Sequence, residues 1–179
     1  MSVNTTFDFV KLCQYSLFLG CRTPVSLREA QFSAAFFNDE AISLMEIVLK
    51  NLQKKVSIPQ GRVLKAAKAA LRKLRIKGTQ YLILSIVFVG PKRMRAINKK
   101  YLDHDYVTDV LTFDFGKSQQ GEIIICPGVA RAQAQAHQTS TENEIILYVI
   151  HGILHLAGFD DRKPKDTLQM RKMENELLK

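Results

Sequence analysis

Cysteine, long apolar runs and acidic residues are all scarce in this sequence. Its cysteines, Cys13, Cys21 and Cys126, are scattered, which argues against a disulfide framework or a Cys-x-x-Cys metal site and favours a reducing, cytoplasmic setting. No stretch reaches about 18 consecutive apolar residues, so we expect no transmembrane helix and no membrane partner. The chain carries 17 Asp and Glu against 26 Lys and Arg, a formal charge of +9. Such a charge attracts polyanions and makes nucleic acid the leading expected partner, although charge alone does not separate this role from solubility.

The 179 residues fit one domain that begins near Met45. Residues 1–44 show no sustained hydrophobic period, so we treat them as an N-terminal extension without a predicted element, and Met45 is a candidate for the true start. Within residues 45–179 we expect strands at Glu46–Leu52, Leu82–Val89, Thr108–Phe113 and Glu122–Cys126, and helices at Val63–Leu74, Lys92–Tyr101, Val129–His137, after Thr141, and at Pro164–Leu178. This order predicts an α+β fold with a mixed sheet of about four strands and about five helices.

Two histidines four residues apart, His151 and His155, lie in an otherwise apolar predicted helix. Side chains at this spacing share one helix face, so both imidazoles can reach one ion. Gly158 can adopt the left-handed conformation that ends a helix, which lets the chain turn back and bring Asp161 to the same ion. Three protein ligands with the fourth position open are typical of catalytic zinc. We therefore predict one Zn²⁺ per chain on a core helix, held by His151, His155 and Asp161.

The other residues of this helix leave alternatives open. Glu144 and Tyr148 share the stripe of the two histidines, but Thr141 and Glu144 also form a capping-box pattern, which gives Glu144 a structural role. A lone H-x-x-x-H is more often a pair of half-buried core histidines, and the glycine break followed by a carboxylate is what favours a metal. Gly152 stands where an H-E-x-x-H zinc peptidase has its general-base Glu, so peptidase chemistry is not predicted.

The helix near Val63–Leu74 has a basic face. A phosphate backbone is one partner for such a face, and a solvated helix surface is the commoner explanation. The side chains that form it are Lys65, Lys68, Arg72, Lys73, Arg75 and Lys77.

From about Met45 to the C-terminus, the chain resembles the YbeY family of bacterial endoribonucleases. Four segments carry the resemblance, in matching order and spacing: Ile97-Asn98 through Tyr101, Thr108 to Phe113, Gly121-Glu122-Ile123, and His151 to Asp161. The family's metal signature is similar to H-G-x-L-H-L-x-G-x-D-H. The resemblance implies zinc ligands at His151 and His155, and activity in ribosomal RNA maturation and ribosome quality control.

Two departures from the family pattern bear on activity. The third ligand position holds Asp161 in place of histidine, and a carboxylate weakens the bound ion as a Lewis acid and can shift the preference towards a harder metal. Leu102 replaces an arginine that the family uses in catalysis, so Arg93, Arg95, Lys99 or Lys100 contacts the RNA instead, or the nuclease is weakened. The resemblance gives Asp160 an orienting or turn role. It places Thr108 and Asp109 on the floor of a cleft, and a purely structural role of a Thr-Asp pair that opens a strand is the alternative.

Our leading hypothesis is a cytoplasmic, metal-dependent endoribonuclease of ribosomal RNA processing that prefers single strands. The resemblance implies the small ribosomal subunit and an Era-like GTPase as partners. A second hypothesis is an RNA- or ribosome-binding assembly factor with a structural metal, which Leu102 and Asp161 favour. A third is a metal-dependent hydrolase of another substrate.

Overall fold

The computed structural model describes residues 46–74, 83–115 and 120–179, which belong to one compact unit. Their elements follow in the order β1 (Glu46–Asn51), α3 (Gln60–Leu74), β2 (Ile83–Phe88), α4 (Pro91–Leu102), β3 (Val110–Asp114), β4 (Gln120–Ile125), α5 (Pro127–Ala136), α6 (Thr141–Leu156) and α7 (Pro164–Leu177). The predicted order of strands and helices is confirmed. The N-terminal extension, 1–44, and two members of the predicted basic face, Arg75 and Lys77, lie outside the described residues.

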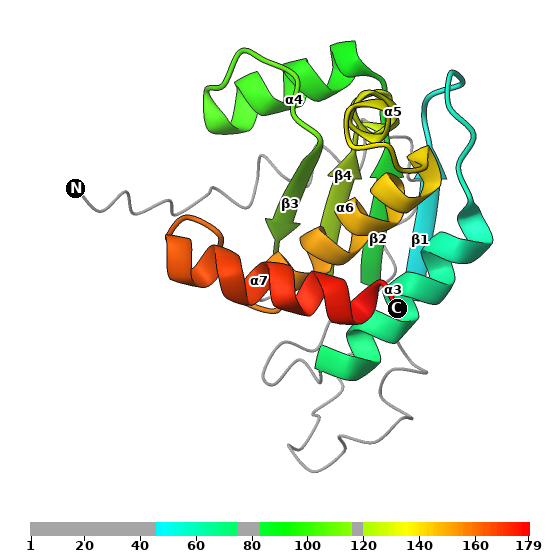
Figure 1. Cartoon of the computed structure of the whole chain (residues 1–179). Helices are drawn as coiled ribbons and strands as arrows, with labels where there is room; N and C mark the ends of the chain where they lie inside the picture. The colour runs from blue at the N-terminus through cyan, green and yellow to red at the C-terminus, as the bar shows by residue number, and fades with distance from the viewer. Residues whose placement is uncertain (1–45, 75–82, 116–119) are drawn as a thin grey trace, which may run out of the picture. The chain divides into compact units, whose positions relative to one another are not determined.

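The four strands form one mixed sheet in the order β1-β2-β4-β3 (Figure 1). β1, β2 and β4 are parallel, and β3 joins as an antiparallel edge strand beside β4. The register places Ser85 and Phe113 on either side of Glu122. The mixed sheet of the sequence prediction is therefore confirmed. No helix in these parts of the chain is long and apolar enough to cross a membrane.

Helix α6 forms the centre of the core. Ile145, Val149, Ile150, Ile153 and Leu154 are fully buried on it, which fits a helix that is apolar almost all round. Burial of each such side chain stabilises the fold by about 1.5–3 kcal/mol. The helix packs closely on the sheet, since a Cβ at Gly152 would come within 2.7 Å of the Ile123 side chain. A Glu side chain in place of Gly152 would clash with the sheet. Close packing therefore explains why this position lacks the general-base Glu of a zinc peptidase.

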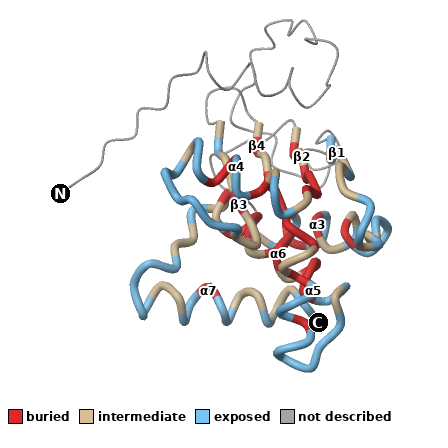
Figure 2. Tube along the Cα trace, turned by 90° about the horizontal axis from the view of Figure 1, so that it is seen from above, coloured by how far each residue is buried: buried red, intermediate tan, exposed pale blue. Residues whose placement is uncertain are grey.

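The two faces of the sheet carry different elements. Gly121 and Ile123 of β4 face α6, since a Cβ at Gly121 would meet Leu156 and one at Gly152 meets Ile123. Side chains alternate along a strand, so Glu122 lies on the opposite face. Its neighbour Phe113 makes an edge contact with Tyr101 of α4, with ring centroids 5.5 Å apart. Figure 2 shows α5, α6 and α7 together on one side of the strands. We call these the α6 face and the α4 face.

The start of α6 corrects one sequence prediction. Ser140, not Thr141, is the N-cap residue, and its Oγ accepts a hydrogen bond from the Asn143 N–H at 3.1 Å. The predicted capping box at Thr141 and Glu144 is therefore wrong, because the cap lies one residue earlier and Asn143, not Glu144, occupies the third helical position. Glu144 is instead buried, with 7% of its surface exposed.

Candidate metal centre

Helix α6 brings the two predicted histidine ligands together. Their rings meet edge to face, with centroids 4.6 Å apart, and the two Nε2 atoms are 3.0 Å apart. This approach follows directly from the four-residue spacing, because such side chains are neighbours on a helix surface. Both residues are half-buried, and 24% of the His151 side chain remains exposed. The pair therefore presents two ring nitrogens to one point at the edge of the core.

The turn after α6 supplies the third predicted ligand. The Gly158 and Phe159 N–H groups donate to the carbonyls of His155 and Leu154, at 2.9 and 3.0 Å, a pattern that caps a helix end. Gly158 has the predicted left-handed conformation, with φ +88°. The chain then reverses, and Asp161 Oδ2 comes within 3.8 Å of His151 Nε2. One ligand atom from each of His151, His155 and Asp161 lies within 4.8 Å of the others.

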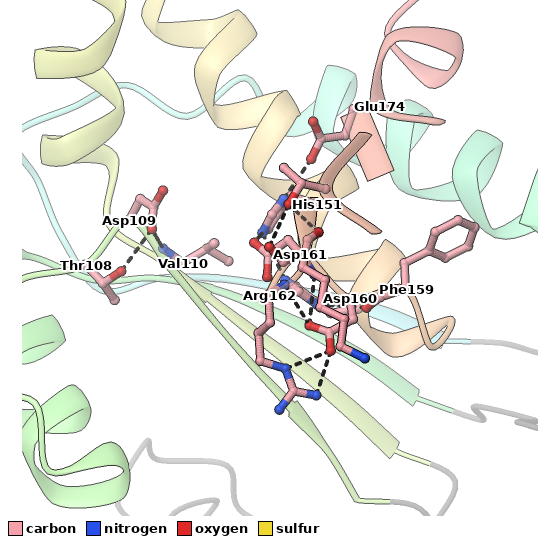
Figure 3. A network of polar contacts seen from close by, with 12 residues as sticks. Thr108, Asp109, Val110, His151, Phe159, Asp160, Asp161, Arg162 and Glu174 are labelled. Carbon is pink, nitrogen blue, oxygen red and sulfur yellow. Dashed lines mark hydrogen bonds and ion pairs between the residues drawn. The ribbon is translucent and has the colours of Figure 1, made fainter. Parts of the chain in front are cut away.

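Hydrogen bonds on the far side of each ring determine how the histidines point. His151 Nδ1 is 2.7 Å from the Glu174 Oε1 of α7, and His155 Nδ1 is 3.1 Å from the Phe159 carbonyl oxygen (Figure 3). A carbonyl and an ionised carboxylate can only accept, so both Nδ1 atoms carry the hydrogen. Both Nε2 atoms then hold lone pairs directed at each other.

This donor set fits a small cation. Two lone pairs 3.0 Å apart repel, and only a cation or a shared proton makes the approach favourable. A tetrahedral ion with metal–ligand bonds of about 2.0–2.1 Å holds its ligand atoms about 3.3 Å apart, close to the observed separation. The Asp161 carboxylate adds the negative charge that a divalent ion prefers. The group can thus bind a metal, with two neutral imidazoles and one carboxylate.

Sequence reasoning missed the contacts that hold the rings. Glu174 lies 23 residues after His151 on a helix rich in charged residues, and only 14% of its side chain is exposed. No local pattern separates it from the other acidic residues of α7. The Phe159 carbonyl is a backbone group, so residue type gives no signal for it either. Histidine ligands in metal sites commonly have such outer partners, which fix the tautomer and the ring orientation.

Asp160 shapes the turn. Its Oδ1 accepts hydrogen bonds from the Asp161 and Arg162 N–H groups, at 2.8 and 3.2 Å, and its Oδ2 accepts one from Arg162 Nε at 2.7 Å. The hydrogen bond from the Arg162 side chain is the main reason why the pKa of Asp160 falls to about 2. The carboxylate therefore stays ionised and keeps the turn that carries Asp161.

The start of β3 lies beside α6. Asp109 Oδ1 accepts hydrogen bonds from Thr108 Oγ1 and the Val110 N–H, at 2.9 and 2.8 Å (Figure 3). Burial raises the pKa of Tyr148, and the charges of Asp109 and Glu144 raise it further. Asp109 is thus close enough to act on Tyr148, which stands three residues before His151 on α6.

The four basic residues that we expected to contact RNA differ in their surroundings. Arg95 Nε and Lys99 Nζ donate to the two carboxylate oxygens of Asp105, at 2.7 and 2.9 Å. Lys100 Nζ lies 5.5 Å from the centroid of the Tyr101 ring, and Arg93 is partly buried. Leu102, in the position of the family arginine, is 46% exposed at the end of α4. A role for these residues towards RNA stays a prediction.

The chain is similar to proteins of one described family. The family described as Endoribonuclease YbeY matches residues 48–179. The Endoribonuclease YbeY of Chloroherpeton thalassium is 32% identical over 136 residues, which cover 75% of this chain and 94% of the relative. That of Chlorobium luteolum is 36% identical over 104 residues, 57% of this chain and 76% of the relative. A solution structure of a Thermotoga maritima protein matches with a TM-score of 0.50 and 26% identity, over 74% of this chain and 86% of that one.

Proposed function

Because this chain belongs to the YbeY endoribonuclease family, we propose that it is a metal-dependent ribonuclease that cuts single-stranded RNA. His151, His155 and Asp161 hold the ion, which we propose to be one Zn²⁺ per chain. The observation that carries the proposal is the pair of Nε2 atoms 3.0 Å apart, each aimed by a hydrogen bond on the opposite side of its ring.

The residues of the site have separate tasks. When bound, a divalent ion supplies positive charge for a scissile phosphate and acidifies a water molecule. His151 and His155 would hold the ion with ring nitrogens from α6, and Asp161, with 43% of its side chain exposed, would hold it with a carboxylate from the turn after α6. Because Asp161 is a carboxylate, it leaves less positive charge at the ion than a third histidine would. This lowers the electrostatic attraction for phosphate and favours harder metals.

In the cell, we propose that the protein acts in the cytoplasm on ribosomal RNA precursors, during maturation and quality control of the ribosome. The small ribosomal subunit and an Era-like GTPase are the proposed partners. The family and the +9 charge of the chain support RNA as the substrate.

Metal content and RNA cleavage, measured on the same samples, test the proposal. We compare wild type with His155→Ala and with a control, His137→Ala, whose exposed histidine lies at the end of α5. Wild type and the control should hold about one ion per chain and cut a single-stranded RNA, and His155→Ala should do neither. If the wild-type protein holds its ion but never cuts RNA, the nuclease proposal fails and the assembly-factor function is favoured. Cleavage unaffected by His155→Ala would remove the metal from the mechanism.

A further inference from the structure

The loop after α4 exposes an ordered pair of aromatic rings. His104 and Tyr106 stack with their centroids 5.3 Å apart and an interplanar angle of 18°, and Tyr106 Oη lies 3.3 Å from His104 Nδ1. Tyr106 is nevertheless 56% exposed. In the described parts of the chain, three of the five exposed large apolar residues, Leu102, Tyr106 and Val107, fall in this one segment. Such a concentration of exposed apolar surface is typical of a binding site.

Contacts with α4 hold the loop in place. Asn98, which is 1% exposed, donates from Nδ2 to the Tyr106 carbonyl at 3.0 Å. Arg95 and Lys99 both donate to Asp105, between the two rings in sequence. Their hydrogen bonds lower the pKa of Asp105 to about 2, so the ion pairs persist at neutral pH. Rings that are ordered before binding lose little conformational entropy when a ligand stacks on them.

The surroundings of the rings favour a nucleobase as the ligand. A base has a flat apolar face and a charged backbone, and proteins bind unpaired bases with aromatic rings set beside Lys and Arg. Arg95 and Lys99 supply that positive charge here, with 57% and 61% of their side chains exposed.

The chain links the two rings to the metal centre. Tyr106 is three residues before Asp109, and three residues of chain span at most about 11 Å. Asp109 in turn acts on Tyr148, one helical turn before His151. We propose that His104 and Tyr106 form a stacking platform for an unpaired base of the RNA strand that reaches the metal centre. The proposal rests on the proposed ribonuclease function and names the part of the surface that selects single strands.

The binding of two labelled RNAs tests the platform without depending on cleavage. The probes are an eight-nucleotide oligoadenylate and a duplex of the same length, and fluorescence anisotropy at low salt gives both dissociation constants. The variants are Tyr106→Ala, Tyr106→Phe and, as an exposed apolar control, Leu168→Ala, which is 69% exposed on α7. Tyr106→Ala should weaken oligoadenylate binding about 5- to 100-fold. Tyr106→Phe should restore most of that affinity, and Leu168→Ala should bind as wild type does.

The duplex distinguishes stacking from a general loss of charge or fold. Paired bases offer no free face, so duplex binding should be the same in all four proteins. The platform is overturned if Tyr106→Ala binds oligoadenylate as wild type does, or if it weakens both probes equally. If the protein never cuts RNA but binding still depends on Tyr106, the nuclease proposal fails and the platform stands. If the protein cuts RNA, but neither cleavage nor oligoadenylate binding changes in Tyr106→Ala, the platform fails and the nuclease proposal stands.

Discussion

On the α6 face of the sheet, His151 contacts Glu174 of another helix in a half-buried position, whereas on the α4 face the charged pair of Arg95 and Asp105 lies in water. His151 meets Glu174, whose side chain is 14% exposed, at 2.7 Å. Arg95 meets Asp105 at the same distance, with 57% and 45% of the two side chains exposed. Water and salt screen the second pair far more than the first. The two pairs therefore have the same length but unequal interaction energies. Substitutions on the two faces should show this difference.

The largest effect should come from Glu174→Gln. The amide can still accept from His151 Nδ1, but it lacks the charge that makes the ring a better ligand, so metal affinity should fall about 10- to 100-fold. Competition with a chromogenic chelator measures this affinity without any assay of cleavage. The control is Glu176→Gln on the same helix, whose carboxylate pairs with Lys73 at 2.9 Å. Equal losses in both variants would show a general effect of charge.

Glu122→Gln should reveal the cost of a half-buried charge on the α4 face. Burial raises the pKa of Glu122 to about 7, although Lys50 opposes this. A carboxyl group with a raised pKa in the folded state contributes no penalty below its unfolded pKa of about 4.5 and destabilises the protein as the pH rises through 7. At pH 8.5 the variant should be more stable than wild type by about 2 kcal/mol, and at pH 4.5 equal to it. Urea unfolding at both pH values measures the difference, and an equal gain at both would refute the assignment.

Gly158→Ala should destabilise the turn that carries Asp161. The φ of +88° disfavours any residue with a Cβ, and no atom lies within 4 Å of the added methyl group, so backbone strain acts alone. We expect a loss of about 1 kcal/mol in the free energy of unfolding. Gly61→Ala is the matched control, since it lies in α3 with equally open space and should stabilise that helix. Thermal unfolding distinguishes the two directions.

Asp105→Asn should have the smallest effect on stability. Its partners Arg95 and Lys99 are exposed, and the solvent replaces their contacts when the charge is removed. The thermal midpoint should stay close to that of wild type, and the remaining difference should shrink further in high salt. A large, salt-independent destabilisation would show that the pair on the α4 face acts like the half-buried contact at Glu174.

Local patterns predicted the parts of the site that lie close together in sequence. The spacing of His151 and His155 determines that their rings meet, because the helix repeat brings them to one face. Gly158 marked the end of α6 because few other residues accept its backbone conformation. The cap of α6 was harder to place, since Ser140 and Thr141 are adjacent and both residue types cap helices.

By itself, the sequence determined the order of the strands and helices, the family, and a helix with two ring nitrogens ready for a metal. These properties depend on hydrophobic period, helix repeat and glycine conformation, which act over a few residues. Only the tertiary structure decided that Glu174 orients His151, that Glu122 lies half-buried on the α4 face, and that Asp109 is close enough to Tyr148 to act on it. Each of these contacts joins elements distant in sequence, so packing of helices on the sheet, and no local pattern, brings them together.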